Sequence, residues 1–146
     1  MVSDPFDLER FVQAQRGVYD TALQELRAGR KRSHWIWFIF PQVAGLGMSA
    51  TSRRYSLTGL EEARAYLAHP LLGQRLREAT TALLAQRASA SAVLGELDAL
   101  KFRSSMTLFA LADPAEPRFI QALERFFRGE ADPRTLELLN APDPDS

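Results

Sequence analysis

The chain has 146 residues, of which 46% are hydrophobic, and this size suits one domain with a single core. Its 18 basic and 18 acidic residues cancel, which argues against a dedicated nucleic-acid-binding protein, because affinity for phosphates depends on an excess of cations. The lack of cysteine excludes disulfides, thiolate nucleophiles and cysteine-ligated metal sites. We predict one globular domain over residues 1–139, followed by a disordered tail, residues 140–146, that has nothing to bury.

Helical patterns account for most of this domain. Apolar residues recur at helical spacing, and glycine, proline and capping residues divide the pattern into short helices. Gly29 is a natural helix C-terminus, and Thr58 with Glu61 forms a capping box before a further helix. The expected helices cover residues 6–12, 18–28, 60–68, 70–84, 90–97, 99–111, 117–127 and 133–139. The predicted fold class is mainly α, a single compact domain of about five to eight helices with at most a minor β element.

The most hydrophobic run is residues 35–40. Its aromatic and β-branched content favours a strand, but a continuous apolar run suits a buried helix equally well. No second run of this character could pair with it, so we expect buried helical or irregular structure. If the ring of Trp37 lies in the core, Trp37→Ala should cost about 3–5 kcal/mol. The run is too short to span a membrane, and the N-terminus lacks the pattern of a signal peptide, so we expect a cytoplasmic protein.

Basic residues are concentrated in one part of the chain. Residues 26–60 contain no acid and six cations, namely Arg27, Arg30, Lys31, Arg32, Arg53 and Arg54. This stretch predicts either a basic patch or a solvated face. Residues 30–34, which end in Ser33 and His34, lie directly before the aromatic run, and such a cluster of cations, hydroxyl and imidazole is typical of an anion site. The alternative is that the cations are solvated and His34 only marks the entry to the core.

A glycine-rich loop follows the aromatic run. Residues 45–50 match the spacing of the dinucleotide-binding fingerprint, but the strand–helix–strand unit that this motif requires is missing. Two alternatives are a phosphate-binding loop, with Ser49 and Thr51 nearby, and a plain surface loop.

Residues 101–107 form the most unusual polar run, in which Lys101 would lie near Ser104 on a helix. Lys31 and Lys101 are the only lysines among the 18 basic residues, and an amine in a partly apolar setting can act as a base. The alternative is that Lys101 pairs with Asp98 and that the hydroxyls bond to the helix backbone.

The two histidines, His34 and His69, together with the lack of cysteine, predict no transition-metal site, and no cofactor is implied. His69 precedes Pro70 and is interpreted as a helix-entry residue.

Several motifs together resemble a bacterial and fungal family of unknown function, DUF1810, whose members are often mislabelled calpastatin. They are DPFDL at residues 4–8, GRKRSHWIWFIFPQ at 29–42, GLG at 45–47, AYLAHPLLG at 65–73 and KFRSSMTLF at 101–109. The resemblance covers residues 4–139 and implies a compact, mainly helical domain. It implies no activity, and nothing in these residues supports the protease inhibition that the calpastatin label suggests.

These observations predict a pocket that binds or processes a phosphorylated or nucleotide-like small anion. The expected catalytic residues are His34, Lys101 and Ser104. The expected ligand-binding residues are Arg32, Trp35, Gln42, Tyr55 and Arg103, with Trp37 completing an aromatic floor. In particular, we expect His34 and Lys101 to converge with Arg103 on one concave, positively charged site.

Two other functions are open at this point. A protein-interaction module would dock through residues 35–40 and would need their aromatic rings to be exposed. A nucleic-acid accessory protein would use the basic patch and bind with strong salt dependence. The residues specify neither a reaction nor an oligomeric state.

Overall fold

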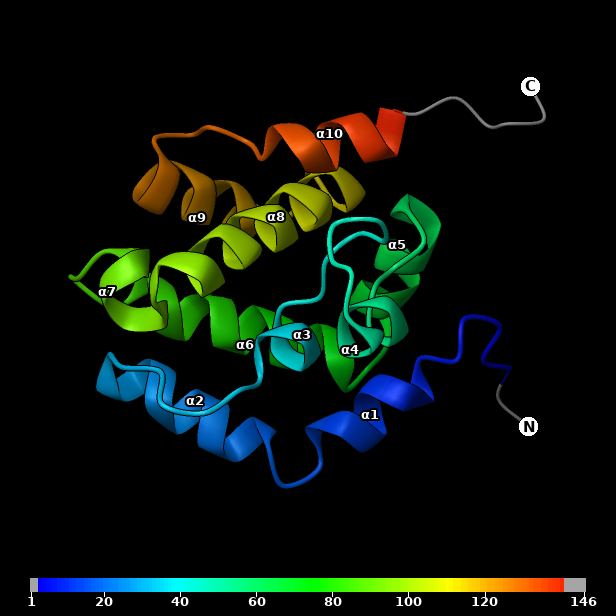
Figure 1. Ribbon diagram of the computed structural model, residues 1–146, viewed down its shortest axis with the longest axis horizontal. Coiled ribbons are helices and arrows are strands. Elements are labelled where there is room, and N and C mark those ends of the chain that lie inside the picture. Colours follow the sequence, from blue (N-terminus) through cyan, green and yellow to red (C-terminus); the bar gives the residue numbers. More distant parts are fainter. Residues whose placement is uncertain (1–2, 141–146) are drawn as a thin grey trace.

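Ten helices make up the described part of the chain, residues 3–140, in this computed structural model (Figure 1). In chain order they are α1 (Glu9–Gln15), α2 (Tyr19–Ala28), α3 (Ile36–Ile39), α4 (Ala50–Arg54), α5 (Leu60–Ala68), α6 (Leu72–Leu84), α7 (Ala90–Leu94), α8 (Glu96–Ala112), α9 (Pro117–Phe127) and α10 (Pro133–Asn140). The mainly α, single-domain prediction is confirmed. The number of helices exceeds the expectation because α3 and α4, of four and five residues, are too short to show a helical period in the sequence.

The expected disordered tail lies outside the described residues, except for Asn140, which ends α10. Among residues 3–140, no helix is both long and apolar enough to cross a membrane.

The helix α8 lies at the centre of the fold. It packs against α5, α7, α9 and α10, while α6 packs against α2, α5 and α9. In Figure 1, α8 runs across the middle, with α9 and α10 on one side and α6 and α2 on the other. Its side chains Phe102, Met106 and Phe109 are fully buried, as their spacing of four and three residues requires. Because α8 is surrounded by other helices, the residues on it that still reach solvent are good candidates for function.

Two helix starts differ from the prediction. The break between α7 and α8 falls at Gly95, whose φ of +88° lies in the left-handed region that favours glycine, and not near residue 98. The acid that accepts hydrogen bonds from Thr58 before α5 is Glu62 and not Glu61. The Thr58 backbone N–H and its hydroxyl both donate to Glu62 Oε1, at 2.9 and 3.0 Å. The N-cap of α5 is Gly59 and not Thr58, so Glu62 takes the position expected of Glu61. Glu62 is also buried and pairs with Arg10 at 2.9 Å.

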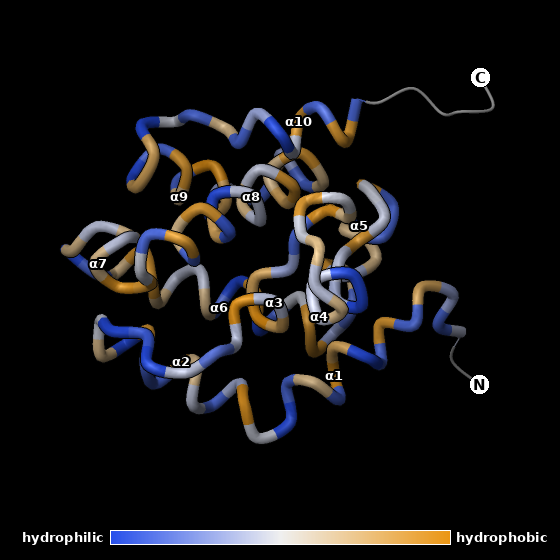
Figure 2. Tube along the Cα trace, in the orientation of Figure 1, coloured by the Kyte–Doolittle hydropathy of each residue, from blue (hydrophilic) through white to orange (hydrophobic). Residues whose placement is uncertain are grey.

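The aromatic run forms a single buried helical turn. Its core is α3, and Trp35, Ile36, Ile39 and Phe40 are all buried, which confirms the expectation of a mostly buried, non-strand segment. The ring of Phe40 packs edge-on against Phe102 of α8, with 4.8 Å between centroids. Figure 2 shows this segment as a hydrophobic stretch in the middle of the molecule.

An excursion of the chain, residues 44–56, leaves the helical body and returns to the same place. Its two ends meet at an isolated β-bridge between Val43 and Leu57, which is the minor β element of the described residues. The Ala44 N–H donates to Leu57 O at 2.7 Å, and the Leu57 N–H donates to Gln42 O at 2.8 Å. This excursion carries the glycine-rich loop and α4, and we call it the 44–56 excursion.

Candidate functional site

His34 and Lys101 line one hollow of about 400 Å³, although they are far apart in the sequence. The wall comes from three places: the loop and turn around α3, the start of α4 in the 44–56 excursion, and the first half of α8. The full lining consists of Lys31, His34, Trp35, Ile36, Trp37, Phe38, Ser49, Thr51, Asp98 and Lys101. We call this the lysine hollow, because it gathers both lysines of the chain.

Asp98 joins the two lysines. Lys31 Nζ lies 2.8 Å from Asp98 Oδ2, and Lys101 Nζ lies 3.3 Å from Asp98 Oδ1. Lys31 also donates to Ser33 O at 2.5 Å, and its side chain is only 7% exposed. The Lys101 side chain is 33% exposed and has no other hydrogen-bond partner within residues 3–140. The alternative in which Lys101 pairs with Asp98 is therefore confirmed, but Lys101 still keeps N–H groups that face the hollow.

Both amines lie over indole rings. Lys31 Nζ is 5.1 Å from the ring centroid of Trp35, and Lys101 Nζ is 4.8 Å from that of Trp37. Trp35 is buried, whereas Trp37 is half-buried and lines the hollow. Trp37 is thus part of the floor of this site and not part of the core.

The glycine-rich loop packs against this floor. A side chain at Gly47 would come within 3.1 Å of the Trp37 ring and 2.5 Å of Ser52 Oγ, and Gly45 has a φ of +102°. The glycine spacing therefore reflects close packing and a left-handed turn, and no strand–helix–strand unit surrounds it among residues 3–140. The two hydroxyl residues Ser49 and Thr51 do line the hollow.

The loop that carries His34 is held by Glu25 of α2. Its carboxylate accepts hydrogen bonds from the Ser33 hydroxyl, from the backbone N–H groups of Arg32 and Ser33, and from Trp35 Nε1 at 2.9 Å. Partial burial alone would raise the pKa of Glu25, but these hydrogen bonds outweigh it and lower the pKa to about 2. His34 therefore projects from a well-anchored loop, with its own side chain exposed.

A second hollow, of about 590 Å³, lies next to the first and shares Lys31, His34, Asp98 and Lys101 with it. Arg32 lines this second hollow and not the first. His34 and Lys101 thus line the same two hollows, and Arg32 lies beside them in the second, while their role in a common site stays a prediction.

Four of the predicted residues lie elsewhere. Arg103 donates to the backbone oxygens of Glu130 and Ala131 at 2.9 Å, because two residues along a helix turn it about 200° away from Lys101. The prediction that Arg103 converges on this site is therefore wrong. Ser104 is buried, and its hydroxyl donates to Leu100 O at 3.1 Å, as the backbone-bonded alternative predicted.

Gln42 and Tyr55 belong to the packing around the 44–56 excursion. Gln42 is buried, and its Nε2 has no partner within residues 3–140. The ring of Tyr55 packs edge-on against Phe38, with 4.8 Å between centroids. Neither Gln42 nor Tyr55 lines the lysine hollow. The prediction that Gln42 and Tyr55 line the site is therefore wrong.

The residue that sequence reasoning undervalued is Asp98, which was considered only as a local partner of Lys101. A detectable signal existed, because Asp98 lies three residues before Lys101 and is one turn away on a helix. Its second contact, with Lys31, depends on the tertiary fold. His69 lies outside the hollow, and its Nδ1 accepts the N–H groups of Leu71 and Leu72 at 3.2 Å, which supports its interpretation as a helix-entry residue. No group of three or more potential metal ligands occurs within residues 3–140.

Comparisons with known proteins give a family but no activity. A family described as "Protein of unknown function (DUF1810)" matches residues 5–139. The crystal structure of the conserved hypothetical protein Rv1873 from Mycobacterium tuberculosis is similar at 50% sequence identity and a TM-score of 0.93, over 95% of this chain and 100% of that one. No curated protein matches. Neither the family nor this similar structure comes with a known ligand or reaction.

Proposed function

The chain belongs to the DUF1810 family of proteins of unknown function, and we propose that its lysine hollow binds a small phosphorylated, nucleotide-like molecule. One observation carries this proposal: the partly exposed amine of Lys101 lies 4.8 Å from the ring centroid of Trp37, in the same hollow as His34. A cationic group beside an accessible aromatic ring suits a ligand that has both a phosphate and a flat ring.

The roles divide along the wall. Lys101 and His34 would bind the phosphate, and the hydroxyl of Thr51 would add a hydrogen bond. The indole of Trp37 would stack on the ring of the ligand. Lys31 is already engaged by Asp98 and Ser33, so its role would be to position Asp98 and not to contact the ligand.

Catalysis is a further part of the proposal. Of the titratable groups in the hollow, Lys31 and Asp98 are only 7% and 18% exposed, so His34 and Lys101 are proposed to transfer the proton, and His34 is exposed to solvent. Ser104 is not proposed as a nucleophile, because its hydroxyl is buried and bonded to the backbone of its own helix.

The two other functions gain less support. Docking through residues 35–40 needs exposed aromatic rings, but Trp35 and Phe40 are 1% and 0% exposed. A nucleic-acid accessory role would depend on the basic residues 26–60, and within that range Lys31 is neutralised by Asp98. This role predicts a steep, linear fall of log affinity with log salt concentration, which a small ligand with one phosphate does not show.

Titration of the tryptophan fluorescence, to which Trp35 and Trp37 both contribute, tests the proposal. The probe is adenosine monophosphate, compared with adenosine and with inorganic phosphate. We expect the monophosphate to quench the emission with a dissociation constant that is several-fold lower than that of either fragment, because it alone uses both Lys101 and Trp37.

Matched variants separate the hollow from the rest of the surface. Lys101→Met should weaken binding of the monophosphate at least about tenfold, which is the loss of one charge-assisted contact of about 1.4 kcal/mol. Arg53→Gln removes an exposed cation outside the hollow and should leave binding unchanged. Equal binding by the parent and Lys101→Met, or no quenching at millimolar probe, would show that the hollow is not the site.

A further inference from the structure

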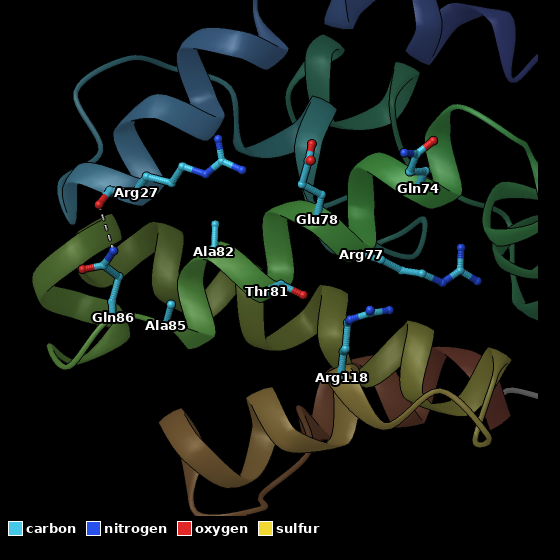
Figure 3. Close-up of a pocket in the computed structure, with 9 residues that line it drawn as sticks. All are labelled: Arg27, Gln74, Arg77, Glu78, Thr81, Ala82, Ala85, Gln86 and Arg118. Carbon is cyan, nitrogen blue, oxygen red and sulfur yellow. Dashed lines mark hydrogen bonds between the residues drawn. The ribbon is translucent and has the colours of Figure 1, made fainter.

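A longer groove, of about 770 Å³, runs along α6 and shares no residue with the lysine hollow. Figure 3 shows Arg27 of α2 at one end of it and the guanidinium groups of Arg77 and Arg118 together at the other, with small side chains such as Ala82 between them. We propose that this groove binds an extended acidic peptide segment that has a carboxylate near each end.

The paired guanidinium groups form a prepared anion site. Arg77 Nε and Arg118 Nη1 lie 3.1 and 2.6 Å from the same carboxylate oxygen, Glu116 Oε1, and this shared contact holds the two groups side by side. Their side chains are 30% and 42% exposed, whereas Glu116 is 12% exposed. One carboxylate cannot satisfy all the N–H groups of two guanidinium groups, so donors remain for a second, incoming carboxylate.

The opposite end carries an uncompensated cation. Arg27 lies in the last turn of α2 and makes no ion pair within residues 3–140. The acid that lines the groove, Glu78, already accepts a hydrogen bond from the Tyr19 hydroxyl. Three arginines line the groove, whereas two acids, Glu78 in its lining and Glu116 beside Arg77 and Arg118, offset them, so the groove keeps an excess of one positive charge.

The length of the groove selects a peptide over a compact metabolite. Gln74 lies near the start of α6 and Ala85 is its C-cap, and a helical rise of about 1.5 Å per residue places them about 16 Å apart. An extended chain spans this distance in about five residue steps of about 3.3 Å. The floor contains Thr81, Ala82 and Ala85, which are small enough for a peptide backbone to lie close to α6.

Nuclear magnetic resonance of the whole chain tests the proposal. The probe is a blocked hexapeptide with glutamate at both ends and alanine and glycine between them, titrated at low salt. We expect backbone amide shifts at Thr81, Ala82 and Ala85, and these shifts should shrink as salt is added, because the contacts are solvent-exposed. The same peptide with glutamine at both ends should cause much smaller shifts.

Charge-neutralising variants locate the contacts. Arg27→Gln and Arg118→Gln should each weaken binding about threefold and together about tenfold, whereas the matched control Arg53→Gln should change it less than about twofold. Thermal melting of each variant checks the fold, and Arg27→Gln alone decides the matter if the double variant melts early, because Arg27 makes no ion pair in the described chain. Equal binding of the two hexapeptides, or no effect of Arg27→Gln, would overturn the proposal. Tighter binding of oligothymidylate at the same amides would overturn it in favour of a phosphate polymer.

Discussion

The two lysines of the chain share one carboxylate, yet they should respond differently to substitution. Lys31→Met removes a 2.8 Å contact with Asp98 and a hydrogen bond to Ser33 O from a side chain that is 7% exposed. Charged hydrogen bonds contribute about 1.5–3 kcal/mol, and Asp98 keeps Lys101 as a partner, so we expect a loss of about 2 kcal/mol. Lys101→Met removes one 3.3 Å contact from a side chain that is 33% exposed, and such pairs contribute about 0.5 kcal/mol or less.

Calorimetry converts these values into melting temperatures. A chain of 146 residues has an unfolding entropy of roughly 0.3 kcal/mol per kelvin, at about 2.1 cal/mol per kelvin per residue. Lys31→Met should therefore lower the Tm by about 7 °C, and Lys101→Met by less than about 2 °C. If the Lys101 variant loses as much stability as the Lys31 variant, Lys101 is a structural residue, and the division of roles in the lysine hollow is refuted.

Three further predictions concern stability. Trp35→Ala should cost about 3–5 kcal/mol in urea denaturation and Trp37→Ala only about 1–2 kcal/mol, because Trp35 is 1% exposed and Trp37 is half-buried; equal costs would contradict this placement. The pKa of Glu25 falls from 4.5 to about 2 on folding, so the ionised carboxylate stabilises the fold above pH 4.5, and this stabilisation is lost as the pH falls towards 2. Allowing for solvent screening, Glu25→Gln should lower the free energy of unfolding by on the order of 2 kcal/mol at pH 7 and by far less at pH 2.5. A loss that does not depend on pH would contradict this role of Glu25. Gly73→Ala should lower stability by about 2 kcal/mol or more despite its better helix propensity, because the new Cβ would lie 2.1 Å from Leu67 O, and a neutral effect on the thermal melt would show that α6 shifts easily.

The helical architecture was predictable because local signals and packing agree along most of the chain. Gly29, for example, ends α2 with a φ of +78°, as its position after an amphipathic segment indicates. The errors occur where tertiary contacts override a local pattern. The Thr58 pattern points to Glu61, but α5 is capped one residue later, at Gly59, so the acid that accepts from Thr58 is Glu62, which also pairs with Arg10.

The site was predictable only in part. Lys101 and His34 were found because both are unusual residues beside dense apolar segments, and these segments do meet in the core. The sequence could not reveal that Asp98 contacts Lys31, because no local pattern relates positions so far apart. Arg103 and Ser104 were included because they are close to Lys101 in the sequence, although the turn of α8 directs them elsewhere.

The β-bridge at the base of the 44–56 excursion affects how the lining of the lysine hollow can vary among homologues. The bridge between Val43 and Leu57 brings the two ends of this stretch together, and contacts near its second end, such as Arg10 Nε donating to Arg54 O at 2.8 Å, hold that end against the helical body. Lengthening such a loop is inexpensive, since a doubling of its length costs only about 0.6 kcal/mol in closure entropy. The wall that bears Ser49 and Thr51 can therefore accept insertions and new side chains, whereas the wall that bears Lys101 is confined by the helices packed around α8. If the lysine hollow binds the ligand proposed above, homologues should differ in the part of it that the excursion contacts and agree in the part that Lys101 contacts.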